Sequence, residues 1–492
     1  MTEESPGAAP EGQNERGEAL KSTPKRWARL AIFVVLGVAI AAAAFTASSQ
    51  SRSAAGHVMT PAVGATPVFQ NLGVLGGPAN QPGRLRQCQL DGTCYGPDQI
   101  RNAYGFQPLL NKGITGNGST IVIIDAYGSN TLQQDFDINN AYWGLPAQTI
   151  QVVAPFGVAS TTPANGFGWK GETTLDVNTA HYIAPAAKIV LVVAKSNNDA
   201  DILAATKYVS DHNLGDVVSQ SFGEAEQCMD PGLLKAQNKL FRKMTEQGIT
   251  LLASSGDAGA AQPSCDGSMF IKAASTPASD PNVTGVGGTD LVATPPTGTL
   301  PTSTSANPSF EVTPGGMYVS ERVWNEGIGL ASGGGFSVVY PRPAYQSHAV
   351  RDSRARGVPD VAYSASLGHG ILVIMTCTDA QAESCGGVGT FVFRFGGTSA
   401  GSPQWAGLVA MAVQLGHGRL GLMNPVLYQL GSPSSYFHDV VSGDNGVPAG
   451  APGTPITGFQ AVPGWDAATG LGSPKAGDLV PVLAQSHNNT AG

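Results

Sequence analysis

The sequence predicts an α/β fold: a mainly parallel sheet with helices on both faces, in a single domain. Three observations support this. Continuous apolar runs are typical of strands that are buried on both sides, as in parallel sheets. Helical patterns separate these runs along the chain. The 492-residue chain is also rich in glycine, with 64 residues, and only 13% charged, which suits a compact, loop-rich protein.

The elements alternate in the order that such a sheet requires. We expect strands over residues 120–125, 188–194, 216–221 and 249–255, and helices over residues 171–182, 199–211 and 232–246. Ligand-binding and catalytic groups in open parallel sheets gather beyond the carboxyl ends of the strands. Residues 290–320 are rich in Thr, Pro and Ser, and we expect them to form a long surface loop.

The ends of the chain differ in composition from its body. We divide it into a polar and basic cytoplasmic N-terminus, a signal sequence or membrane anchor, a linker, the folded domain and a disordered tail: residues 1–29, 30–47, 48–87, 88–485 and 486–492. The apolar run follows a basic flank, which predicts that the N-terminus stays in the cytoplasm. The alternative is a buried helix. The prediction is an exported protein, either secreted or anchored to the outer face of the membrane by residues 30–47.

The charge balance excludes one class of partner. The net charge is −8 and the body of the chain has no sustained basic run, so we expect no nucleic-acid partner. No internal repeat or second compositional domain is evident. We therefore expect a single folded domain, and we also expect it to be monomeric.

The six cysteines also favour export. Cys88 lies close to Cys94 and Cys377 close to Cys385, while Cys228 and Cys265 remain as a longer pair. An even count in this arrangement predicts three disulfides formed outside the cytoplasm. Spacing alone leaves the connectivity open, and buried free thiols are the alternative.

Ser399 is the first candidate for chemistry. It follows Gly397-Thr398 in a tight turn, and the apolar, helix-like run of residues 404–412 comes next. Free backbone N–H groups at a helix start can stabilise a developing oxyanion. A serine hydroxyl is a weak nucleophile and needs a base. The alternative is a glycine-rich turn that only begins a buried helix.

A histidine could be that base. Asp125, His181 and Ser399 occur in the chain order that is typical of subtilisins. The His-Gly-Thr turn of those enzymes is absent, however, and His181 lies in an apolar helical stretch. An ordinary core or surface histidine is the competing interpretation.

Carboxyl groups offer a different base. Glu172 and Asp176 are four residues apart, so a helix places them on one face, where they can share a proton. Such a pair can act first as base and then as acid. Asp257 ends a predicted strand in Ser-Ser-Gly-Asp, and its protonated carboxyl could donate a hydrogen bond to an oxyanion. The alternatives are a solvated helix face and an ordinary turn.

These three segments together resemble the sedolisin family, the serine-carboxyl peptidases. The resemblance covers roughly residues 88–485, and further family-like segments occur in the same order at residues 183–189, 218–223, 277–279, 287–289, 332–337 and 357–361. It implies a subtilisin-like fold and peptide hydrolysis at acidic pH. By this resemblance Ser399 is the nucleophile and Glu172 the general base. Asp176 supports Glu172, and Asp257 belongs to the oxyanion hole.

The resemblance also implies one structural calcium ion. Its ligands would be the carboxylates of Asp439 and Asp466 and the backbone carbonyls of Val440, Val462 and Gly464. Oxygen ligands suit this hard cation. Val462 stands where the family often has glycine, and a loop without metal is the alternative.

One departure from the family and one alternative concern function. Many family members carry a long pro-domain, whereas only about forty residues separate residue 47 from residue 88, which is too short for one. An inactive envelope-associated binding protein on the same fold is the competing function. The sequence leaves the cleavage preference and the choice between endo- and exopeptidase action open.

Overall fold

The structure is a computed structural model that describes residues 68–74, 88–297, 315–351, 353–431, 435–448 and 455–486. The predicted cytoplasmic segment 1–29 and apolar segment 30–47 lie outside these ranges, as does the predicted tail beyond Ser486. Within the described ranges, none of the helices combines the length and the apolar character needed to cross a membrane.

An eight-stranded sheet forms the centre of the fold, in the order β13-β12-β8-β6-β3-β5-β4, with β16 also paired to β12. Every pairing is parallel except that of β12 with β13, which confirms the predicted mainly parallel sheet. The bounds are β3 (Thr120–Ala126), β4 (Gln151–Val153), β5 (Lys188–Ala194), β6 (Val217–Gln220), β8 (Thr250–Ser254), β12 (Thr284–Ala293), β13 (Tyr318–Val323) and β16 (Val361–Ser364).

The alternation of side chains along β3 explains its unbroken apolar sequence. Ile121 and Ile123 pack into one hydrophobic core, while Val122 and Ile124 pack into a second core on the opposite face. Successive strand residues point to opposite faces, so a sheet covered on both sides needs apolar residues at every position.

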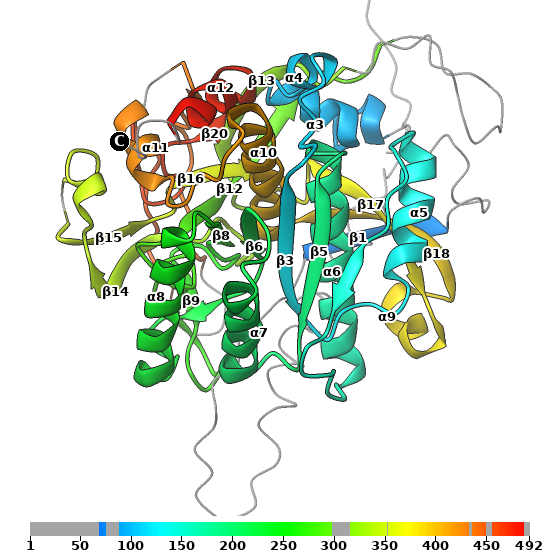
Figure 1. The fold of residues 1–492 in the computed structure, drawn as a ribbon, viewed down its shortest axis with the longest axis horizontal. Helices are drawn as coiled ribbons and strands as arrows, with labels where there is room; N and C mark the ends of the chain where they lie inside the picture. Colours follow the sequence, from blue (N-terminus) through cyan, green and yellow to red (C-terminus); the bar gives the residue numbers. More distant parts are fainter. Residues whose placement is uncertain are drawn as a thin grey trace, which may run out of the picture. The chain divides into compact units, whose positions relative to one another are not determined.

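Helices cover both faces of this sheet, as predicted (Figure 1). One core takes side chains from α6 (Pro163–Ile183), α10 (Gly401–Gly416) and α12 (Ala476–Ser486). The other takes most of its helical side chains from α7 (Asp199–Asp211) and α8 (Pro231–Glu246). The predicted helices over residues 199–211 and 232–246 agree with α7 and α8, to within one residue.

The helix predicted over residues 171–182 is longer than expected. It begins at Pro163, where the Thr162 hydroxyl accepts a hydrogen bond from the backbone N–H of Asn165 at 3.2 Å. Its first turns contain Pro, Asn and two Gly, which are poor helix formers. The N-cap and tertiary packing therefore extend it beyond the range that local propensity indicates.

A second sheet corrects the predicted linker 48–87. Its order is β1-β18-β17-β2, and β1 pairs antiparallel with β18, so this part of the linker is a strand. The bounds are β1 (Val68–Val74), β2 (Cys94–Tyr95), β17 (Gly370–Cys377) and β18 (Gly389–Gly396). Phe69 packs edge-on against Phe167 and Phe393, which anchors a segment whose surrounding composition is that of a linker.

The predicted surface loop 290–320 is also too long at both ends. β12 continues to Ala293 and β13 begins at Tyr318, and the two strands pair through Thr289 and Val323. Residues 298–314 lie outside the described ranges. Strand pairing with β12 therefore extends into residues whose composition favours a loop.

Shorter elements complete the described chain. The helices are α3 (Pro97–Ala103), α4 (Gln107–Asn111), α5 (Leu132–Trp143), α9 (Ala382–Cys385) and α11 (Asn424–Leu430), with 3-10 turns η2 (Ala344–Gln346), η3 (Asp379–Gln381) and η4 (Thr398–Ala400). The strands are β7 (Glu224–Ala225), β9 (Ala261–Pro263), β10 (Phe270–Lys272), β11 (Ser275–Thr276), β14 (Gly335–Pro341), β15 (Ala355–Val358), β19 (Phe437–His438) and β20 (Ser473–Pro474).

All six cysteines form disulfides: Cys88–Cys94, Cys228–Cys265 and Cys377–Cys385. The prediction of three disulfides is confirmed, and the alternative of buried free thiols is wrong.

Candidate active site

Ser399 lies in the 3-10 turn η4, directly before α10, and is 6% exposed. Gly397 precedes it with a φ of 95°, a left-handed conformation that favours glycine. A Cβ atom at this position would also lie 2.6 Å from Oδ2 of Asp257. The glycine therefore permits both the turn and the close approach of Asp257.

Strand β6 fixes the other side of this turn. The hydroxyl of Ser221 donates to the carbonyl oxygen of Ser399 at 3.4 Å. One turn further into α10, the hydroxyls of Ser402 and Ser219 share a hydrogen bond of 2.8 Å. The start of α10 is thereby held at the carboxyl end of β6, where parallel sheets carry their functional groups.

Glu172 and Asp176 lie one turn apart on α6, and both are fully buried. The alternative of a solvated helix face is therefore wrong. The Ser399 hydroxyl lies near enough to Glu172 to lower its pKa by hydrogen bonding. The Ser221 hydroxyl lowers the pKa of Asp176 in the same way. Within the described residues, none of the carboxylate oxygens of these two side chains has a partner at short hydrogen-bond distance. Hydrogen bonds between catalytic groups are often long without substrate.

A third buried carboxyl group faces the same pair. Asp125 is the penultimate residue of β3 and is completely buried. Its negative charge raises the pKa of both Glu172 and Asp176. The sequence motifs assign Asp125 only to a triad with a histidine, although its position at the carboxyl end of a strand is a signal for a wider role.

Burial is the main cause of the unusual pKa values in this group. It raises the pKa of Glu172 and Asp176 well above their ordinary values and that of Asp125 to about 7. Like charges in close contact cannot all ionise together. The three carboxyl groups consequently retain protons between them at acidic pH and titrate as a coupled set.

Asp257 approaches the serine turn from the carboxyl end of β8. Its Oδ1 accepts hydrogen bonds from the backbone N–H and the hydroxyl of Thr398, at 2.8 and 2.7 Å. Burial raises the pKa of Asp257, and these two bonds lower it in part. No described hydrogen bond reaches Oδ2, so this oxygen can carry the proton and donate it beside Ser399.

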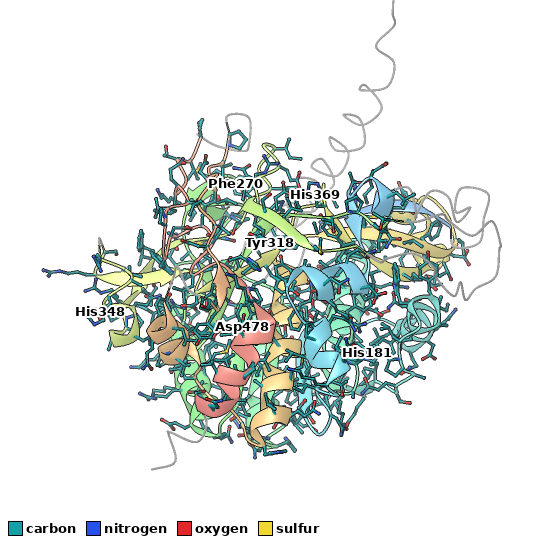
Figure 2. The ribbon with its side chains drawn as sticks, turned by 90° about the horizontal axis from the view of Figure 1, so that it is seen from above. His181, Phe270, Tyr318, His348, His369 and Asp478 are labelled. Carbon is teal, nitrogen blue, oxygen red and sulfur yellow. A yellow bond between two sulfur atoms is a disulfide. The ribbon has the colours of Figure 1, made fainter. Side chains whose placement is uncertain are left out.

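The structure places His181 elsewhere. It lies nine residues beyond Glu172 on α6 and is labelled in Figure 2. Its Nε2 is 3.0 Å from the carbonyl oxygen of Pro146, and its ring packs edge-on against Phe136 of α5. Burial lowers its pKa to about 4. These contacts fit the interpretation of His181 as a core histidine. The candidate bases beside Ser399 are therefore carboxyl groups.

The residues predicted to bind calcium form a second cluster. Both carboxylate oxygens of Asp439 accept from the backbone N–H of Gly464, at 3.2 and 3.0 Å. Asp466 accepts from the N–H of Val462 at 3.3 Å, and Val440 is buried beside Asp439. Burial raises the pKa of Asp466 to about 6. Among the described residues, neither carboxylate takes part in an ion pair, and Asp466 also accepts from the backbone N–H groups of Ala468 and Thr469 and from the Thr469 hydroxyl.

Across the described chain, no group of three or more His, Cys, Asp and Glu side chains is placed to hold a metal. A calcium ion in this second cluster would therefore depend on two carboxylates and backbone carbonyls. This donor set, oxygen only, fits the ion that the sequence predicts.

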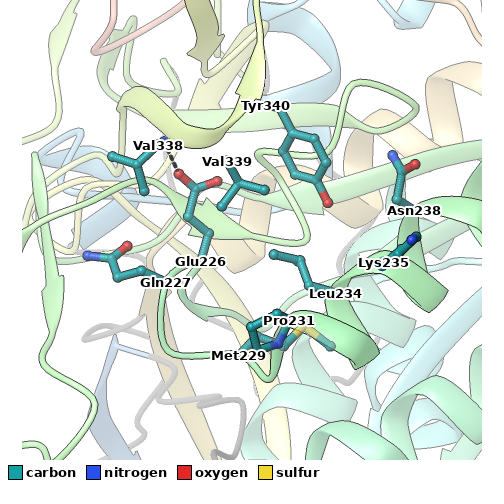
Figure 3. Close-up of a pocket in the computed structure, with 10 residues that line it drawn as sticks. All are labelled: Glu226, Gln227, Met229, Pro231, Leu234, Lys235, Asn238, Val338, Val339 and Tyr340. Atoms are coloured by element: carbon teal, nitrogen blue, oxygen red, sulfur yellow. Dashed lines mark hydrogen bonds between the residues drawn. The ribbon is translucent and has the colours of Figure 1, made fainter.

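A separate cavity of about 530 Å³ lies between the segment after β7, the start of α8 and β14 (Figure 3). Ser399, Glu172, Asp176 and Asp257 do not line it. Glu226, which does, accepts from the Ser337 hydroxyl at 2.8 Å and from the backbone N–H of Val338. This carboxylate is therefore committed to holding β14.

Comparisons with known proteins point in one direction. The family model described as the subtilase family matches residues 156–425. Kumamolisin from Bacillus sp. (strain MN-32) is 33% identical over 80% of this chain and 64% of its own length. Sedolisin from Pseudomonas sp. (strain 101) is 30% identical over 73% of this chain and 57% of its own length. The chain thus spans less than two thirds of either relative.

A solved structure agrees with the sequence comparisons. It is described as Pseudomonas sedolisin, a serine-carboxyl proteinase, complexed with two molecules of pseudo-iodotyrostatin. It is 27% identical, has a TM-score of 0.65, and covers 80% of this chain and 98% of the other.

Proposed function

Because this chain belongs to the subtilase family, in its sedolisin group, we propose that it is a serine-carboxyl peptidase that hydrolyses peptide bonds at acidic pH. The observation that carries the proposal is the buried carboxyl of Glu172 beside the hydroxyl of Ser399 at the start of α10. A serine nucleophile needs an adjacent base, and here that base is a carboxylate.

In the first half of the reaction, the Ser399 oxygen bonds to the carbonyl carbon of the peptide while Glu172 takes the hydroxyl proton. The carbonyl oxygen becomes an oxyanion. Glu172 then returns the proton to the nitrogen of the leaving peptide as the carbon–nitrogen bond breaks. Water hydrolyses the resulting ester in the same way, with Glu172 again as base and then acid.

The other two carboxyl groups have distinct roles in this proposal. Protonated Asp257 donates from Oδ2 to the oxyanion, while Thr398 holds its Oδ1. Asp176 orients Glu172 and shares its proton. Asp257 can donate only below its raised pKa, whereas a carboxylate base remains partly ionised where histidine would be protonated. Both requirements place the activity on the acid side of neutrality.

The proposed setting is outside the cytoplasm. Three disulfides stabilise the described domain, and such bonds persist in oxidising compartments. We propose secretion, or tethering to the outer face of the membrane through residues 30–47, with the domain acting as a monomer on peptide or protein substrates.

Digestion of a peptide library by the wild-type protein and by Ser399→Ala tests the proposal. We expect cleavage at acidic pH by the wild type and none by the variant. If Ser399→Ala cleaves as the wild type does, Ser399 is not the nucleophile. If the wild type binds peptides but cleaves none, an inactive binding protein is the better account.

We also propose that one calcium ion binds through the carboxylates of Asp439 and Asp466 and the carbonyls of Val440, Val462 and Gly464. Support comes from the hydrogen bonds that the N–H groups of Val462 and Gly464 donate to these carboxylates, which hold the two segments close together. The ion would neutralise the buried charge of Asp466 and so stabilise the C-terminal part of the domain.

Removal of calcium by a chelator should lower the melting temperature of the wild-type protein, and added calcium should restore it. Calcium at 100 times its Kd would contribute about 2.7 kcal/mol to the free energy of unfolding. Asp466→Asn should abolish this response. Asp444→Asn, a nearby carboxylate that accepts from the N–H of Gly446, should retain it. An unchanged melting temperature on chelation, with no calcium in elemental analysis, would contradict the site.

A further inference from the structure

A second pair of carboxyl groups lies outside the proposed catalytic set. Glu224 is the first residue of β7 and Asp199 is the first residue of α7. The two side chains lie within hydrogen-bonding reach of one another. Neither is among the main influences on the pKa of Glu172 or Asp176, so the proposed reaction leaves this pair unexplained.

Glu224 lies shortly after a residue that contacts the catalytic serine. Ser221, three residues earlier, contacts Ser399, and β7 is fixed beside β11 by the pairing of Glu224 with Thr276. An extended chain advances about 3.3 Å per residue, so Glu224 lies roughly 10 Å along this segment from Ser221. A peptide held at Ser399 and running beside the segment would place a residue about three positions from the scissile bond near Glu224.

Asp199, the partner of Glu224, is 2% exposed. Neither of its carboxylate oxygens, nor Oε1 of Glu224, accepts a hydrogen bond from a donor among the described residues. Neighbouring acids differ: Asp201 accepts from the Ser196 hydroxyl at 2.5 Å, and Glu226 accepts from Ser337. Buried carboxylates are normally satisfied, but apart from a proton shared within the pair these oxygens have no donor among the described residues.

The electrostatics of the pair favour a cation as a donor. Burial raises the pKa of both groups. The charge of Asp199 raises the pKa of Glu224, and the charge of Asp230 at the start of α8 raises the pKa of Asp199. An empty pair therefore retains a proton. A positively charged nitrogen can replace this proton and donate to both carboxylates. Because Glu224 is only partly buried, the pair can be reached from solvent.

We propose that Glu224, backed by Asp199, forms a specificity subsite for a positively charged nitrogen of the peptide substrate. This nitrogen belongs either to a Lys or Arg side chain or to a free N-terminal ammonium. The inference rests on the proposed peptidase function and adds a preference to it.

Matched peptides test the subsite. One series carries Lys or its uncharged isostere norleucine at each position near the scissile bond, on both sides; a second has a free or an acetylated N-terminus. We expect kcat/KM of the wild type to favour the cation at one position by about tenfold or more, as for a buried charge-assisted pair. Preference for Lys inside the peptide identifies a side-chain subsite, and preference for the free terminus identifies an exopeptidase subsite.

Glu224→Gln and Asp199→Asn should each bring this ratio close to one. Asp211→Asn removes an exposed acid at the other end of α7 and should leave the ratio unchanged. Melting curves show whether each variant is folded. Equal cleavage of cationic and neutral peptides by the wild type, or a preference that survives both substitutions, would overturn the inference.

Binding separates this inference from the proposed function. The affinity of Ser399→Ala for the same Lys and norleucine peptides, and for the free and acetylated peptides, is measured without turnover. A cationic preference in binding supports the subsite even if the wild type cleaves nothing. Cleavage without preference, together with equal affinities, rejects the subsite and leaves the peptidase function intact.

Discussion

Replacement of Glu172 by glutamine should lower kcat by about 10⁴-fold or more, because it removes the base that activates the nucleophile. Glutamine is nearly isosteric, and Glu172 is fully buried without another short hydrogen bond to a described donor. The effect should therefore fall on the chemical step, with little change in KM. Steady-state kinetics on a cleaved peptide at acidic pH measures it.

His181→Ala is the matched control, since His181 lies on the same helix and is buried to a similar degree. Its kcat should stay within a few-fold of the wild type once melting curves show that it folds. Loss of turnover in His181→Ala with retention in Glu172→Gln would instead indicate a subtilisin-type triad of Asp125, His181 and Ser399.

Asp257→Ala should lower kcat by about 10²- to 10³-fold, the typical cost of removing one oxyanion-hole donor. Asp257→Asn is the informative comparison. Its amide oxygen can still accept from Thr398, while its NH₂ group takes the place of protonated Oδ2. We therefore expect Asp257→Asn to retain a much higher kcat than Asp257→Ala. Steady-state kinetics of both variants at one acidic pH measures the difference.

The pH profiles of the wild type and Asp257→Asn should differ on their alkaline side. Burial raises the pKa of Asp257, so the donating form is present below that pKa and is lost as the pH rises through it. An amide donates at every pH. The alkaline limb of the wild-type profile should thus move to higher pH in Asp257→Asn. An unmoved limb, with equal losses in both variants, would remove Asp257 from the oxyanion hole.

The fold was predictable because its central strands are buried on both faces. The unbroken apolar run of β3 is a direct consequence of two cores, and the short cysteine spacings anticipated the pairing of Cys88 with Cys94. Pattern alone failed where tertiary contacts decide. Pro163 starts α6 through a cap and packing, and Phe69 anchors a strand within a linker-like composition.

The candidate site was predictable only in part for the same reason. Ser399, Glu172 and Asp257 occur in motifs with local signatures, and the structure brings all three close together. Asp125 is marked only by its position at the carboxyl end of a strand, and the pair of Asp199 and Glu224 has no local signature. Their surroundings depend on which strand ends and helix starts meet, which a single sequence does not state.

The pH dependence of kcat/KM on a single cleaved peptide tests the central claim, a carboxylate base with a protonated oxyanion donor, most directly. The account predicts a maximum on the acid side of neutrality and a steep loss as Asp257 ionises. A profile that rises through neutrality and peaks above it would contradict the account, because a histidine base would then explain the activity better.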